Sequence, residues 1–302
     1  MLDDSHGAKA PWPFDTRRAQ FGPIKRLAVA LGVAALAVLV AVGAKTPRHD
    51  REWRAEIAVL PEVSLAGDRL TVSEVRDWTY TAEGPRETAY RPRSEELENL
   101  RGLWLMVEPF GGSPAIAHTL VLFEFEGGRL LGLTIEARKE VGEIYSPVDG
   151  ALNTYELGYI WAEARDLLVR RVRYLRHEVY VYPLDLSAAN ARSFLTGLAE
   201  TSMALSERPR FYNTLFSNCT NELAKTAGVN WTPAFILTGY AAPALYDADV
   251  IPGAAQGVPF EAVRARADMT AAIARLPDGS AEAFDRALLA ELSRRFRRRS
   301  GS

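Results

Sequence analysis

The longest apolar run of the chain lies near its start and predicts a helix that crosses a membrane. Residues 27–44 (LAVALGVAALAVLVAVGA) carry no charged side chain. As a helix they would rise about 27 Å, close to the thickness of a bilayer's hydrocarbon core. A cleaved signal peptide is the alternative, because Val42 and Ala44 are small residues placed for cleavage. The polar stretch 1–26 is long for such a peptide, so we expect an uncleaved anchor behind a short disordered tail.

Short apolar runs later in the chain predict the strands of a sheet. The clearest signal is a hairpin. Residues 119–123 are almost entirely apolar, as in a strand buried on both faces, and a glycine-containing turn at 126–129 leads to a second strand at 130–135. Further strands are expected at 69–72, at 75–80, around Tyr159, and at 178–183, where Pro183 ends the run. The stretches 83–93 and 233–258 are expected to be loops.

Helices are predicted by capping residues and by apolar stripes. Ser187 is a typical N-cap for a helix with one apolar face. That face comprises Ala191, Phe194, Leu195, Leu198 and Ala199. A second helix is expected to begin near Asn218-Cys219-Thr220 and to end at Gly228, a typical C-cap residue. Further helices are expected around Leu167 and at 281–299, which ends in a run of arginines.

This mixture of strands and helices predicts an α+β fold, in which helices pack against an antiparallel sheet. We divide the chain into a tail at 1–26, a transmembrane helix at 27–44, a linker at 45–69, a domain at 70–260 and a basic helical segment at 261–302. Basic residues lie on both sides of the apolar run, so the charge distribution does not decide on which side of the membrane the domain lies.

The composition excludes several classes of function. The net charge is -2, and the charged residues are interspersed, which gives no bias toward nucleic acid. With 1 cysteine, an intramolecular disulfide and a thiolate-rich zinc site are excluded. The 4 histidines form no zinc-protease motif, and no phosphate-binding P-loop occurs. We therefore expect neither a metal nor an organic cofactor.

The single cysteine, Cys219, is the first candidate for chemistry. If a helix starts at this position, the thiol lies in its first turn, where the helix dipole and free N–H groups stabilise a thiolate. The same N–H groups could hold an oxyanion when a carbonyl is attacked. Free cysteine is often only a small buried residue, but the polar neighbours Asn218, Thr220 and Asn221 argue against an apolar pocket.

A thiol nucleophile needs a base, and His118 is the better candidate. It opens the first strand of the hairpin after a glycine-rich loop, although a histidine there can equally be a hydrogen-bonded core residue. His177 lies in a segment expected to be exposed. Glu136 ends the second strand, where it could orient His118, or it could pair on the surface with Arg138 or Lys139.

Four blocks of residues together resemble the Lnb N-terminal periplasmic domain family. They are 115–125 around His118, 133–146 around Glu136, 155–166 ending in Asp166, and Tyr212-Asn213 through Asn218-Cys219-Thr220. The blocks lie in the order of the family and extend over roughly half the chain. The resemblance is to circularly permuted papain-like thiol enzymes and to lecithin:retinol acyltransferase relatives, in which the histidine strand also precedes an Asn-Cys helix.

The resemblance implies a periplasmic domain, anchored in the bacterial inner membrane, that transfers acyl groups through a cysteine thioester. In the Lnb group the acyl chain comes from a phospholipid and goes to the N-terminal amine of a lipoprotein. It implies Cys219 as nucleophile, His118 as base and Glu136 as its partner. Candidate substrate-binding residues are Asn218, which could also hold the oxyanion, Asn213, Tyr212 and Arg138.

The chain also departs from the family. Thr134 stands where a serine usually precedes the glutamate, Glu163-Ala164-Arg165-Asp166 replaces an acidic pair before the aspartate, and no second apolar span follows. Two alternatives therefore stay open. One is a thiol hydrolase that acts on peptidoglycan or peptide amides, and the other is a non-catalytic envelope scaffold.

Overall fold

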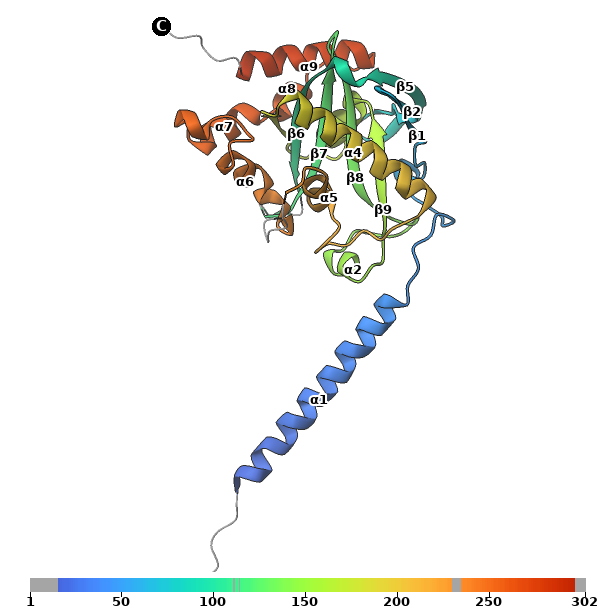
Figure 1. Cartoon of the computed structure of the whole chain (residues 1–302), viewed down its shortest axis with the longest axis vertical. Coiled ribbons are helices and arrows are strands. Elements are labelled where there is room, and N and C mark those ends of the chain that lie inside the picture. Colours follow the sequence, from blue (N-terminus) through green and yellow to red (C-terminus); the bar gives the residue numbers. More distant parts are fainter. Residues whose placement is uncertain (1–15, 111, 114, 230–234, 297–302) are drawn as a thin grey trace, which may run out of the picture. The chain divides into compact units, whose positions relative to one another are not determined.

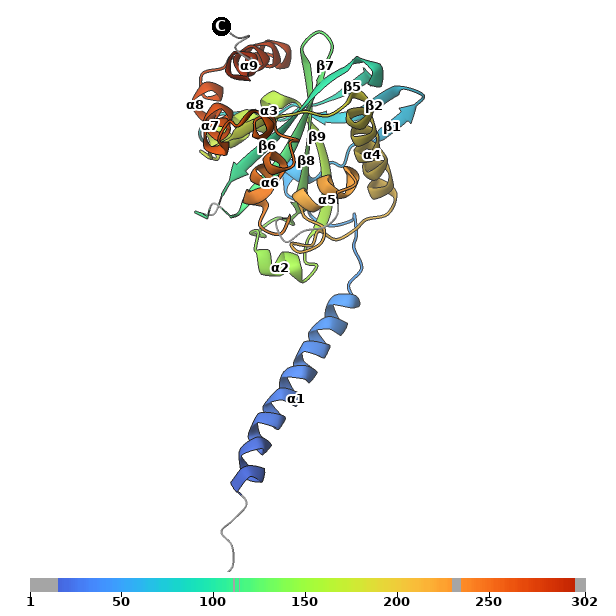
Figure 2. The ribbon, with the colours of Figure 1, turned by 60° about the vertical axis from the view of Figure 1, so that its left-hand side comes forward.

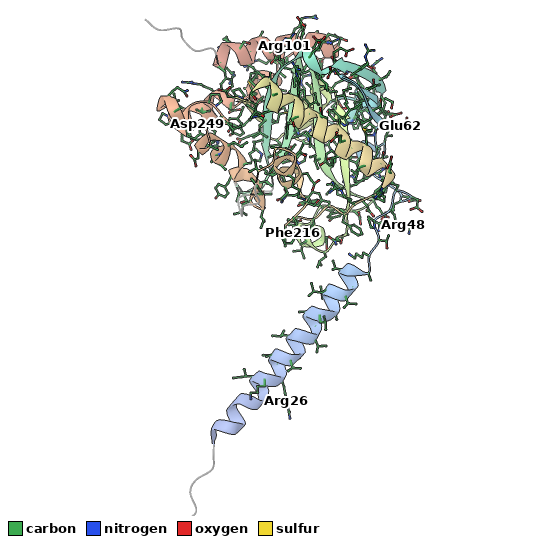
Figure 3. The ribbon with its side chains drawn as sticks, in the orientation of Figure 1. Arg26, Arg48, Glu62, Arg101, Phe216 and Asp249 are labelled. Atoms are coloured by element: carbon green, nitrogen blue, oxygen red, sulfur yellow. The ribbon has the colours of Figure 1, made fainter. Side chains whose placement is uncertain are left out.

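The computed structural model describes residues 16–110, 112–113, 115–229 and 235–296, and it divides the chain into two units, Met1–Thr46 and Pro47–Ser302. The first contains helix α1, Thr16–Gly43. Residues 16–26 are thus helical, whereas a disordered tail was expected, and residues 1–15 lie outside the described part. Within α1, Ile24–Gly43 is long and apolar enough to cross a membrane, a test that a signal sequence also passes. Its apolar side chains are exposed (Figure 3), as a lipid-facing surface requires.

The second unit is built around a sheet with the strand order β1-β2-β9-β8-β7-β6-β10, in which β5 pairs with β2. Figure 1 shows strands β6 to β9 behind helix α4, Ala188–Glu207. The strands are β1 Val63–Ala66, β2 Arg69–Arg76, β5 Tyr90–Glu96, β6 Leu100–Pro109, β7 Ala117–Phe125, β8 Arg129–Arg138, β9 Glu156–Ala162 and β10 Tyr180–Leu184. All neighbours are antiparallel except β2 and β9, whose ends meet in parallel at Arg76 and Ala162. A small sheet joins β3, Thr79–Tyr80, to β4, Pro85–Glu87.

The predicted hairpin is present as β7 and β8, with partners running from Leu120 and Thr134 to Phe125 and Arg129. Alternate residues of β7 enter two different cores, Val121 and Phe123 on one face and Leu120 and Leu122 on the other. The continuous apolar run is therefore explained by burial on both faces.

Helices cover both faces of the sheet (Figure 2). On one face α4, Ala188–Glu207, packs against β1, β6 and β9, while α5, Cys219–Thr226, packs against β7 and β8. On the other face α3, Ala164–Val169, and α9, Ala281–Phe296, pack against β8 and each other. The shorter helices are α2 Pro147–Ala151, α6 Ala241–Asp247, α7 Phe260–Ala267 and α8 Thr270–Ile273. The predicted N-cap is confirmed, because the Ser187 hydroxyl accepts from the N–H of Asn190.

Several expectations differ from the structure. The predicted loop at 83–93 contains β4 and most of β5, because an exposed edge strand takes its order from backbone pairing with β2 and needs no apolar pattern. The predicted loop at 233–258 contains α6, although residues 230–234 are outside the described part. The pattern did not indicate β6, which lies inside the sheet. Residues 45–69, expected as a linker, hold buried Ile57 and strand β1.

Candidate active site

Cys219 is the first residue of α5, and Asn218 caps that helix. The Asn218 side-chain oxygen accepts from the N–H of Asn221 at 2.8 Å, and its amide donates to the carbonyls of Thr214 and Phe235, both at 2.8 Å. The Asn218 amide is therefore occupied within the fold and cannot hold an oxyanion without breaking these bonds. The N–H groups of Cys219 and Thr220 remain as donors, because the first turn of a helix has no intrahelical acceptor for them.

His118 lies at the beginning of β7, and its hydrogen bonds define how the ring is oriented. Nε2 is 2.7 Å from Oγ1 of Thr134 and 3.2 Å from Oε1 of Glu136. The Thr134 hydroxyl donates its only hydrogen to Glu136 at 2.7 Å, so it must accept from Nε2–H of His118. This arrangement leaves Nδ1 as the ring nitrogen that can exchange a proton with the thiol. Thr134 supplies the hydroxyl that the usual serine would supply.

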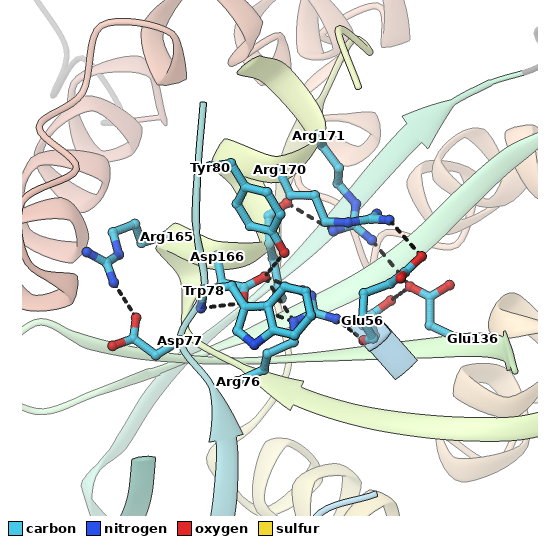
Figure 4. Close-up of polar contacts among 12 residues, drawn as sticks. Glu56, Arg76, Asp77, Trp78, Tyr80, Glu136, Arg165, Asp166, Arg170 and Arg171 are labelled. Carbon is cyan, nitrogen blue, oxygen red and sulfur yellow. Dashed lines mark hydrogen bonds and ion pairs between the residues drawn. The ribbon is translucent and has the colours of Figure 1, made fainter. Parts of the chain in front are cut away.

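Carboxylates from the neighbouring strands lie on both sides of His118. Glu108 of β6 is its direct partner in the register, and Glu136 of β8 is its ion-pair partner. Arg171 contacts both carboxylates. Its Nε is 2.6 Å from Glu108. Its Nη2 is 3.6 Å from Glu136, as Figure 4 shows. Arg171 lies in a π-helical turn, Arg170–Tyr174, that follows α3. The two negative charges are thus offset by one buried guanidinium.

Cys219 and His118 shift each other's pKa. Burial alone raises the pKa of the thiol, but the charge of His118 and contacts with Thr119 outweigh it and lower the pKa of Cys219 to about 7. Burial alone lowers the pKa of His118, but the charges of Glu136 and Cys219 outweigh it and raise that pKa to about 10. Between these values the pair is a thiolate beside an imidazolium, the state required of a cysteine nucleophile.

A cavity of about 340 Å³ opens beside the two residues. Its apolar wall is formed by Phe110, Ile116, Ile135, Tyr145, Ile236 and Leu237. Its polar wall includes Glu108, Glu136, Lys139, Arg170, Arg171 and His177. The volume is sufficient for a small ligand or for part of a longer one. In the part of the chain that the structure describes, no cluster of three or more potential metal ligands occurs.

The other predicted site residues fall into two groups. Tyr212 lines the cavity, and its hydroxyl is 3.3 Å from that of Tyr145. Asn213 instead organises its own loop. Its side-chain amide donates to the carbonyl of Ala151 and to Oδ1 of Asn153, and its side-chain oxygen accepts from two backbone N–H groups. Asn213 is not among the described residues that line the cavity, and its role in substrate binding stays a prediction.

Arg138 also lies away from the cavity. Its guanidinium donates to the carbonyls of Ile57 and Ala58 and stacks on Trp53 at 4.3 Å. The side chain therefore fastens residues 53–58 to the end of β8. Arg138 is thus not among the described residues that line the cavity, and its role in binding substrate stays a prediction.

Sequence reasoning missed three members of the site. Glu108 and Arg171 come from segments for which no chemistry was predicted, and His177 was expected to be exposed. His177 has 35% of its side chain exposed and lines the cavity, with Nδ1 2.6 Å from Glu108. The available signal was a charged residue inside an apolar run, Glu108 after Leu103–Val107, since a buried carboxylate requires a partner.

Asp166, the end of the third block, has a structural role. Its carboxylate accepts from Nη2 of Arg76 at 2.7 Å and from the N–H of Trp78 at 2.8 Å, and Arg165 pairs with Asp77 nearby (Figure 4). These contacts hold the start of α3 against the end of β2.

With this geometry established, comparison with known proteins places the chain. The model of the Lnb N-terminal periplasmic domain family matches residues 88–247. The chain belongs to this family. The match includes Cys219, His118 and Glu136, and together with the apolar helix it fits a single-pass membrane protein with a periplasmic domain. No curated protein and no solved structure matches the chain.

Proposed function

We propose that the protein is a membrane-anchored, cysteine-dependent acyltransferase of the cell envelope. It would take an acyl chain from a phospholipid, hold it as a thioester on Cys219, and pass it to an amine acceptor such as a lipoprotein. The observation that carries the proposal is the thiol at the start of α5, paired with a His118 that Glu136 orients. The order of histidine strand and cysteine helix supports kinship with permuted papain-like thiol enzymes.

The first half-reaction follows from the ion pair. The Cys219 thiolate attacks the ester carbonyl, and the N–H groups of Cys219 and Thr220 stabilise the oxyanion that forms. The C–O bond then breaks, and the His118 imidazolium gives its proton to the departing alkoxide. A lysophospholipid leaves, and the acyl group remains on sulfur while His118 is neutral.

Two features favour a lipid as the acyl donor. One wall of the cavity beside Cys219 is apolar, which suits an acyl chain. Large apolar side chains are also exposed next to it: Ile144 at 84%, Val148 at 67% and Phe216 at 60% of their surface. They flank Tyr145, Pro147 and Thr214, which line the cavity, and exposed apolar groups at such a site mark contact with lipid or protein. Figure 3 labels Phe216 on this part of the unit.

A thiol hydrolase is the second candidate, and the polar wall of the cavity favours it. The cavity that contains Cys219 is also lined by Lys139, Arg170 and His177. These polar side chains can bind water or charged groups beside the thioester. The acceptor decides between the two reactions: water gives hydrolysis, and an amine gives transfer.

The decisive experiment measures the intact mass of the full-length protein after incubation with phospholipid vesicles. The wild type should gain one fatty-acyl mass that hydroxylamine removes. Cys219→Ala should gain none, and His118→Ala should gain it far more slowly. His49→Gln is a matched control, because His49 bonds to the carbonyl of Leu205, outside the cavity.

Three results would overturn the proposal in different ways. If the wild type never acylates but cleaves peptidoglycan peptides in a Cys219-dependent way, the hydrolase replaces the transferase. If neither reaction occurs and Cys219→Ala has no effect in cells, a scaffold role replaces both. A protein whose sequenced N-terminus starts at residue 45 would be soluble, and the membrane anchor would be refuted.

A further inference from the structure

The cavity contains a second histidine–carboxylate pair that the first half-reaction does not use. His177 and Glu108 line the same cavity as Cys219 and His118, and Nδ1 of His177 is 2.6 Å from Oε1 of Glu108. Glu108 is itself buried and fixed by Arg171 at 2.6 Å, so it holds the imidazole in one orientation. The hydrogen bond at Nδ1 leaves Nε2 of His177 available to a ligand.

His177 also lies where two cavities adjoin. A second cavity of about 570 Å³ shares His177 and Phe110 with the first, and its other walls include Tyr180, Tyr182 and Phe260. A second substrate can therefore approach the thioester past His177 while the acyl chain occupies the apolar wall beside Cys219.

From this arrangement we propose that His177, oriented by Glu108, is the base that deprotonates the incoming amine in the second half-reaction. This inference rests on the proposed thioester chemistry. Proton counting leaves one proton for a second base. An ammonium group must lose two protons to become an amide nitrogen, and His118, neutral after the first half-reaction, can accept one.

The steps balance as follows. His177 takes one proton from the ammonium group, and the free amine attacks the thioester carbonyl. The C–N bond forms, the nitrogen gives its second proton to His118, and the C–S bond breaks. Cys219 leaves as a thiolate beside a His118 imidazolium, which restores the starting state, and His177 releases its proton to solvent. Water as acceptor needs only His118 for the attack.

The test separates the two half-reactions. Cys219 is loaded with an activated ester, p-nitrophenyl octanoate, whose leaving group needs no proton, so that the test does not depend on the natural donor. The loss of the acyl mass is then followed with a short peptide that has a free N-terminal amine, with hydroxylamine, and with buffer alone. His177→Gln is compared with the wild type and with the His49→Gln control.

We expect His177→Gln to slow aminolysis by the peptide by up to about tenfold at pH 7, because an α-amine with a pKa near 8 is only about one-tenth unprotonated there. The deficit should shrink as the pH rises through about 8. Hydroxylamine, which is unprotonated at neutral pH, and water should remove the acyl group at nearly the wild-type rate.

Equal slowing with peptide, hydroxylamine and water would make His177 a structural residue and overturn the inference. Unchanged aminolysis at pH 7 would also overturn it. A wild-type protein that loads from the activated ester and transfers to the peptide, but never loads from phospholipid, would refute the proposed lipid donor and leave the role of His177 standing. Failure to load Cys219 at all would refute both.

Discussion

Replacing Glu136 by glutamine tests whether the carboxylate acts on His118 through its charge. The change keeps the size and a hydrogen-bond acceptor for Thr134, but it removes the negative charge 3.2 Å from Nε2 of His118. At this distance two unit charges interact by about 5 kcal/mol at an effective dielectric constant of 20. Arg171, 3.6 Å from the same oxygen, offsets part of this energy.

If about half of that energy remains, the pKa of His118 falls by about two units, from about 10 to about 8. The sign is fixed, because a carboxylate stabilises the imidazolium and its removal favours the neutral ring. Protonated His118 is needed to release an alkoxide, so the high-pH limb of the acylation rate moves down. At pH 9 the protonated fraction of His118 drops about tenfold, and the acylation rate drops with it. At pH 7 His118 stays mostly protonated in both proteins, so the acylation rate changes little.

The assay is the pH dependence of acyl-enzyme formation from a short-chain phospholipid, followed by intact mass. The acylation rate of the wild type should follow a bell-shaped pH profile. Its two limbs should lie near the pKa values of the Cys219–His118 pair, about 7 and about 10. Glu140→Gln is the control, since Glu140 pairs with Arg51 at 2.8 Å instead of with His118. A Glu136→Gln profile that is lowered equally at pH 7 and pH 9, or is unchanged at pH 9, would refute this electrostatic reasoning.

Three further predictions concern other parts of the structure. Asp285 is buried, one of its oxygens has no partner among the described residues, and burial raises its pKa to about 8, although the N–H of Leu130 opposes the shift. The pKa of Asp285 is higher in the folded than in the unfolded protein, so the wild type loses stability as the pH rises toward 8. In urea unfolding, Asp285→Asn should therefore be more stable than the wild type by about 2 kcal/mol at pH 8. Near pH 4 the two proteins should be equally stable. Asn218→Ala should lower the free energy of unfolding by about 2–3 kcal/mol, since it removes a helix cap and leaves two loop carbonyls unpaired, and Asn218→Asp should recover the cap alone. The double change Ile144→Ser and Val148→Ser should slow acylation of Cys219 from vesicles but not from a soluble activated ester; equal slowing with both donors would contradict lipid contact by these side chains.

The predictions from sequence that hold are those that depend on local physics. A charge-free run of helical length, the glycine turn between two apolar strands, and the cap at Ser187 each act over a few residues. Cys219 is found at the start of a helix for the same reason. Even the pairing of His118 with Glu136 follows from local geometry, because one hairpin turn sets the register of both strands.

Contacts between distant segments decided the rest. The pairing of β6 with β7 places Glu108 beside His118, and Arg171 and His177 both bond to Glu108. Glu108 and Arg171 are charged, and the burial of each depends on the other, 63 positions away in the chain. No local pattern carries such a pairing.

The same limit applies to the two predicted substrate residues that do not line the cavity. Asn213 and Arg138 look chemically suitable in the sequence, but their side chains are occupied by backbone carbonyls of other loops. Sequence alone determined which residue types were available and where the elements with a strong local pattern begin, such as the hairpin and the helices after Ser187 and at Cys219. The tertiary structure decided which polar groups were left free, because a hydrogen-bonding group that already satisfies the fold is not available to a substrate.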